Sequence, residues 1–145
     1  MPLNSLQLSA ACLAMVLLTF AVGLRMLFTR VHEMRSKRIH PQAASTSLKM
    51  AAQLQDAQAA DNFRNLFEVP VLFYVLAAVA IATNYVPDWL VVCAWLFFVL
   101  RLVHSLIHCT YNKVYHRFAA FLASFALLLG MWIAFFFSIV SRSAP

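Results

Sequence analysis

Residues 63–74, with the sequence FRNLFEVPVLFY, decide how the rest of the chain is interpreted. This stretch places Arg64, Asn65 and Glu68 on neighbouring helical turns and then continues as an apolar run to about residue 83. On insertion scales, a charged residue at the centre of a membrane-spanning helix costs roughly 2.5–3.5 kcal/mol, so such a residue usually has a partner. Pro70 lies in the same run, where it removes a helix hydrogen bond and predicts a kink beside Glu68.

A second apolar run carries a polar face that is expected to contact Glu68. Arg101, His104, Ser105 and His108 are spaced i, i+3, i+4 and i+7, which places all four on one side of a helix. We expect the two polar faces to meet, with Glu68 and Arg101 as a candidate interhelical ion pair. His104 and His108 are expected to hydrogen-bond to each other, although their spacing also allows a metal- or haem-binding pair.

The composition is typical of a membrane protein. Of the 145 residues, 63% are hydrophobic and only 11% are charged, whereas a soluble domain is about half apolar and a quarter charged. The formal net charge of +6 comes from basic residues beside apolar runs, which favours a membrane surface over nucleic acid. Cys12, Cys93 and Cys109 stand alone in apolar segments and are interpreted as small apolar residues, with no disulfide framework.

Four apolar runs are each long enough to span the ~30 Å hydrocarbon layer of a bilayer. The predicted spans are residues 6–28, 63–83, 89–111 and 117–140, with a polar connection over residues 29–62. The last two connections are short, which favours antiparallel neighbours. The sequence therefore predicts one all-α domain over residues 1–145, an integral membrane bundle of four helices.

The distribution of Lys and Arg predicts the orientation. The first connection holds Arg30, Arg35, Lys37, Arg38 and Lys49, and the third holds Lys113 with Arg117 at its edge. The N-terminal segment and the turn at residues 84–88 hold none. Because cytoplasmic loops carry an excess of Lys and Arg, both basic connections are predicted to be cytosolic and both termini to lie on the opposite side.

Taken together, these motifs resemble the MAPEG family, the membrane-associated proteins of eicosanoid and glutathione metabolism. The resemblance rests on R-N-x-x-E followed by Pro, on R-x-x-H in the next apolar helix, and on an Arg sixteen residues after the Arg of that motif: Arg64, Asn65, Glu68, Pro70, Arg101, His104 and Arg117. It implies a homotrimer that holds glutathione as a cosubstrate between neighbouring subunits near the cytosolic face. It also implies a lipophilic small molecule as second substrate, which such proteins conjugate, reduce or isomerise.

Position by position, the resemblance implies that glutathione is bound by Arg30, Arg64, Asn65, Glu68, His104 and His108, with Arg117 as the catalytic residue. No metal is implied. The chain departs from the family pattern at several positions. Asp61 stands where an Arg is frequent, His108 where a Tyr is frequent, and Phe118 and Phe121 where a Ser and a Tyr are frequent.

Arg117 is expected near the N-terminus of the fourth helix, where its cation adds to the helix dipole. Both lower the pKa of a bound thiol from its free value of ~8.5, and so favour the reactive thiolate. Two alternatives remain open, one for the role of Arg117 and one for the function of the whole chain. Arg117 can simply mark the membrane boundary, and the chain can be a non-catalytic bundle that has kept the fold while losing the thiol site.

Overall fold

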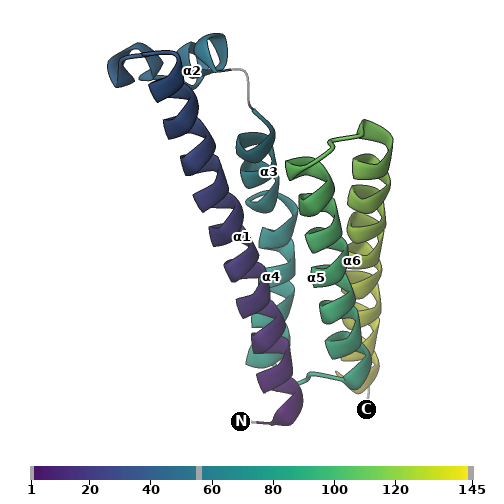
Figure 1. Ribbon diagram of the computed structural model, residues 1–145. Coiled ribbons are helices and arrows are strands. Elements are labelled where there is room, and N and C mark those ends of the chain that lie inside the picture. The colour runs from purple at the N-terminus through teal and green to yellow at the C-terminus, as the bar shows by residue number, and fades with distance from the viewer. Residues whose placement is uncertain (1, 55–56, 144–145) are drawn as a thin grey trace.

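The computed structural model describes residues 2–54 and 57–143, and its elements are all helical. In chain order they are α1 (Leu3–Ser36), the 3-10 helix η1 (Pro41–Ala44), α2 (Ser47–Gln53), α3 (Gln58–Leu66), α4 (Val69–Ala82), α5 (Asp88–Cys109) and α6 (Val114–Ser143) (Figure 1). Within the described residues, four segments are long and apolar enough to cross a membrane, with α3 and α4 counted as one. The predicted all-α bundle with four spans is confirmed.

Helix α1 is much longer than its predicted span. Its 34 residues extend about 50 Å, against ~30 Å of hydrocarbon, so one end projects past the other helices (Figure 1). The last residues of α1, RVHEMRS, are mostly polar and would lie outside the hydrocarbon. Polar residues can continue a helix beyond the membrane, so α1 stays helical to Ser36. Helix α2 lies beyond this projecting end, whereas α1 begins and α6 ends together at the opposite end of the bundle.

The second span is interrupted where a kink in a continuous helix was predicted. Helix α3 ends at Leu66. The Phe67 N–H then donates a 3-10-type hydrogen bond of 2.9 Å to Arg64 O, three residues earlier. Helix α4 then starts at Val69, which places Pro70 in its first turn. A proline costs little there, because the first N–H groups of a helix have no intrahelical acceptor. Glu68 lies in the break between the two helices, with φ −93° and ψ −84°.

Two short turns, each with an asparagine in the left-handed region, join the last three spans. Asn84 (φ 52°) lies in the link between α4 and α5, and Asn112 (φ 48°) lies between α5 and α6. Asparagine tolerates this conformation better than most residues, so both turns are locally encoded. The link between α4 and α5 is also held by a residue that is distant in the sequence. Asn4 Nδ2 of α1 donates to Val86 O at 2.9 Å and to Asp88 Oδ1 at 2.7 Å.

The connection after α1 is ordered by local contacts. Lys37 Nζ contacts Glu33 Oε1 at 2.6 Å and also donates to Gln53 O at 3.4 Å, which ties α2 back to the end of α1. Thr46 is the N-cap of α2 and accepts from the Lys49 N–H at 3.2 Å. Thr46 thus satisfies a backbone N–H in the first turn of α2, which begins at Ser47.

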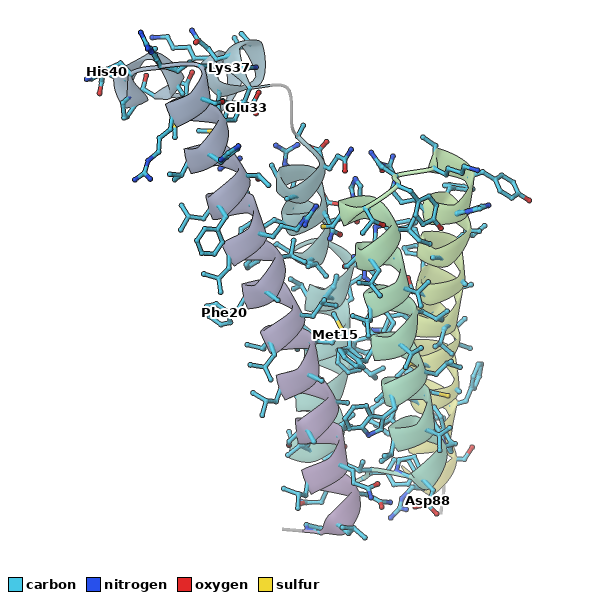
Figure 2. All side chains as sticks on the ribbon, in the orientation of Figure 1. Met15, Phe20, Glu33, Lys37, His40 and Asp88 are labelled. Atoms are coloured by element: carbon cyan, nitrogen blue, oxygen red, sulfur yellow. The ribbon has the colours of Figure 1, made fainter. Side chains whose placement is uncertain are left out.

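The apolar core lies along the axis between α1, α4, α5 and α6. Phe73 of α4 and Phe97 of α5 are fully buried and stack with ring centroids 4.9 Å apart. On α1, Met15 points into the bundle while Phe20 points outward and is 68% exposed (Figure 2). A stripe of such exposed apolar side chains is expected where a helix faces lipid.

Candidate functional site

Polar side chains gather in the interior at the end of α5 that is nearest to the start of α6. Arg101, His104, Ser105 and His108 all lie on the buried side of α5, as their spacing predicts, and each is at most 3% exposed. Hydrogen bonds connect this face to α3 on one side and to α6 on the other. We call these four residues the α5 polar face.

Arg101 is the largest buried polar residue, and its guanidinium is only partly satisfied. Nη2 donates to the backbone oxygen of Asn65 at 3.0 Å, and the guanidinium carbon lies 5.7 Å from the centroid of the Phe121 ring. Nε and Nη1 have no hydrogen-bond partner among the described residues. The predicted ion pair with Glu68 is wrong: the helix break leaves the Glu68 side chain exposed, and no such ion pair exists in the described chain.

His104 is held by the backbone of α6. Its Nδ1 lies 3.0 Å from Arg117 O, and a carbonyl oxygen can only accept, so Nδ1 carries the proton. Nε2 is therefore the acceptor nitrogen of the neutral ring, and it is buried without a hydrogen-bond partner in the part of the chain that is described. The His108 ring is edge-on to His104 at 5.6 Å between centroids, so the expected hydrogen bond between the two histidines is wrong.

Arg117 lies in the first turn of α6, as predicted, because that helix begins at Val114. Its Nη1 donates to Asn112 Oδ1 at 2.9 Å, so the left-handed turn residue also fixes the guanidinium. Arg117 lines a cavity of about 220 Å³, whose other lining residues are Asn65, His104, Val114, Phe118 and Phe121. The cavity thus combines one cation, one amide and one imidazole with an apolar wall.

A hydrogen-bonded network behind the cavity was not predicted from the sequence. Asn62 is fully buried; its Nδ2 donates to Cys109 Sγ at 3.3 Å and its Oδ1 accepts from Ser105 Oγ at 3.3 Å. Arg25 of α1 donates to the backbone oxygen of Cys109. The only local signal for this network is the i, i+3 spacing of Asn62 and Asn65 on α3, which places two amides on one side of the helix.

The remaining predicted residues lie away from this cavity. Arg64 and Glu68 are exposed on the single chain, although both belong to the membrane-spanning segment Gln58–Ala82. They cannot pair along one helix as i and i+4, because α3 ends at Leu66 between them. Arg30 is half-buried on α1, and His108 is buried behind His104 with its Nδ1 unpartnered among the described groups.

A second, larger hollow lies between α1 and the α3–α4 span. It has a volume of about 620 Å³ and an almost entirely apolar lining that includes Phe20, Leu27, Leu66 and Tyr74. Gly23 lies against this hollow, and a Cβ atom at this position would lie 2.9 Å from the Phe63 ring, so any larger residue would displace that ring. The lining of this hollow includes no charged group, whereas the cavity beside Arg117 is lined by a guanidinium, an amide and an imidazole.

Among the described residues, no cluster of three or more His, Cys, Asp or Glu side chains has a geometry that would hold a metal ion. Comparison with family models gives one match: the model of the MAPEG family covers residues 8–137. No curated protein and no solved structure matches the chain.

Proposed function

Because the chain belongs to the MAPEG family, we propose that it is a membrane enzyme that uses glutathione as a cosubstrate to conjugate or reduce lipophilic molecules. Membership and the four spanning helices make it an integral, multi-pass membrane protein. The observation that carries the proposal is the convergence of Arg117, His104 and Asn65 on one cavity. These are a guanidinium, an imidazole and an amide, which together suit an anionic thiol compound.

The unpartnered buried atoms around the cavity match the groups of glutathione, which has two carboxylates, an ammonium group and a thiol. Arg101 Nε and Nη1 are donors, and a guanidinium edge suits a carboxylate. Asn65 Oδ1 and His104 Nε2 are acceptors, and they suit an ammonium group or a thiol proton. Native proteins leave few buried polar atoms unpaired, so five such atoms on four neighbouring residues support a polar ligand in this part of the bundle.

Arg117 is proposed as the catalytic residue. Its guanidinium lies in the first turn of α6, where the helix dipole is positive, and Asn112 holds it there. Both charges favour the thiolate form of a bound thiol, which is the form that attacks electrophiles. The apolar hollow along α1 and the lipid-facing helix surfaces would let a lipophilic second substrate arrive from the bilayer.

The proposal includes the assembly and the orientation. Arg64 and Glu68 are charged and exposed at positions within a membrane-spanning segment, where lipid contact is costly. A homotrimer would cover them with a neighbouring subunit and place them, with Arg30, around glutathione bound between subunits. The excess of Lys and Arg in the connections after α1 and α5 supports a cytosolic location for both and an outside location for the termini.

A non-catalytic bundle is the second candidate, and one observation favours it. Two of the six residues that line the cavity are Phe118 and Phe121, where hydroxyl groups are frequent in the family, and about 220 Å³ is below the usual ~300–1,000 Å³ of ligand pockets. Under this alternative the protein would neither bind glutathione nor stabilise its thiolate.

Glutathione titration of the detergent-solubilised protein, followed by thiolate absorbance at neutral pH, separates the two candidates. For the enzyme, the expected result is saturable binding with thiolate formation, and Arg117→Ala should lower the thiolate fraction about tenfold or more. Arg117→Lys should recover only part of it, because the charge returns without the planar fork. Arg142→Ala is the matched control, since Arg142 stacks over Tyr85 at the opposite end of α6. Wild-type protein without binding would establish the non-catalytic bundle.

A further inference from the structure

His104 is the one ionisable residue lining the Arg117 cavity whose ordinary pKa lies near neutrality. Among the other described lining residues, the Asn65 amide has no basic atom, the Arg117 guanidinium has donors but no acceptor, and the remaining three side chains are apolar. A thiol that loses its proton inside this cavity therefore needs an acceptor, and His104 is the only lining side chain that can provide one.

The geometry prepares His104 for this role. Because Arg117 O accepts from Nδ1, the neutral ring has its lone pair on Nε2. That nitrogen is buried and has no partner within the described residues, on a side chain that is 1% exposed. A base oriented by a third group on its far nitrogen is the arrangement that activates serine and cysteine nucleophiles in other enzymes. Here the third group is the backbone of Arg117, the residue proposed to stabilise the thiolate.

We propose that His104 Nε2 is the general base that takes the thiol proton of the cosubstrate. This inference rests on the proposed use of glutathione and adds a second catalytic residue to it. The S–H bond breaks, its electron pair remains on sulfur, and the proton forms an N–H bond at Nε2. Net charge is conserved, because an imidazolium and a thiolate replace a neutral imidazole and a neutral thiol.

The charged groups around His104 link the protonation of its imidazole to the formation of the thiolate. Arg101 and His108 lie beside His104 on α5, and Arg117 lies opposite on α6; Asp61 on α3 and Glu68 at the α3–α4 break are the nearest acidic groups of the packed span, and both are exposed. A thiolate in the cavity supplies a negative charge next to the imidazolium and the two guanidinium groups. When the sulfur has reacted, the proton passes from Nε2 to the leaving group or to the anion formed on the second substrate, which restores the neutral imidazole.

The test uses purified wild-type protein in detergent and follows proton balance by calorimetry in buffers of different ionisation enthalpy. If His104 takes the proton, glutathione binding at neutral pH produces thiolate absorbance without releasing a proton to the buffer. Thiolate formation accompanied by proton release to the buffer would overturn the proposal while leaving glutathione binding intact. Absence of glutathione binding would overturn the proposed function, and this inference with it.

His104→Gln gives a second and independent measurement, because the glutamine amide is polar but cannot accept a proton. We expect thiolate absorbance at neutral pH to fall at least about tenfold, as is usual when a general base is lost. S-methylglutathione, which has no thiol proton, measures whether the variant still binds the peptide, and thiolate absorbance is compared at saturating glutathione in both proteins. His40→Gln, at an exposed histidine beyond the projecting end of α1, is the matched control (Figure 2). Wild-type thiolate absorbance in His104→Gln would contradict the assignment.

Discussion

The two halves of α5 bury the same side of one helix with opposite chemistry. The first half buries Leu90, Ala94 and Phe97, which contact apolar side chains. The second half buries the α5 polar face, beginning at Arg101, one turn after Phe97. The inward face is continuous, so the change from apolar to polar is set by residue type alone.

The two halves also differ in how completely their interactions are satisfied. In the apolar half, Phe97 is fully buried and stacks on Phe73, so its contacts are complete within one chain. In the polar half, Arg101 and His104 are equally buried but leave nitrogen atoms without partners among the described residues. The apolar half therefore completes its contacts within one chain, whereas the described residues leave part of the polar half unpaired.

The largest expected loss of stability comes from removing a buried side chain in the apolar half of α5. Phe97→Ala removes a fully buried ring and leaves a cavity against Phe73, with a loss at the lower end of the about 3–5 kcal/mol typical of such changes. The lower end applies because packing, and not transfer from water, drives helix association in a bilayer. Unfolding in mixed micelles measures it. Phe137→Ala, at an exposed position on α6, should change stability little; equal losses would contradict the comparison.

A smaller effect is expected from the satisfied part of the polar half. Asn62→Ala breaks the hydrogen bond from Ser105, and buried interhelical hydrogen bonds in membrane proteins average ~0.6 kcal/mol with a maximum near ~1.7. A double-mutant cycle of Asn62→Ala with Ser105→Ala should give a coupling energy in this range. The same cycle with Ser124→Ala should be additive, because Ser124 is equally buried but bonds within its own helix. Additivity in both cycles would show that Asn62 does not tie α3 to α5.

The smallest effect is expected outside both halves, at the projecting end of α1. Glu33→Gln removes the ion pair with Lys37, and i, i+4 pairs on helices contribute only ~0.3–0.5 kcal/mol. The loss should be smaller still at high salt, because counterions screen exposed charges. Micelle unfolding at two salt concentrations provides the measurement. A loss as large as that of Phe97→Ala would mean that the bundle depends on this end as much as on its core.

Much of the fold was predictable because it follows from local properties of the chain. The lengths of the apolar runs determine the number of spans, and the asparagine turns between the last three spans follow from short polar segments. The ends of α1 and the break beside Pro70 were not predictable. Hydropathy marks where a helix leaves the hydrocarbon, not where its hydrogen bonds end, and a proline allows either a kink or a restart.

The sequence by itself determined which residues share the α5 polar face, because the helical period of 3.6 is a property of one segment. It also placed Arg117 in the first turn of α6. Only the tertiary structure decided the partners: Arg101 donates to the Asn65 backbone instead of pairing with Glu68, and His104 bonds to the Arg117 backbone instead of to His108. Partners depend on how far each helix is shifted along its neighbours. That shift is fixed by packing among all four spans and by the break that turns Glu68 outward, and no single segment encodes it.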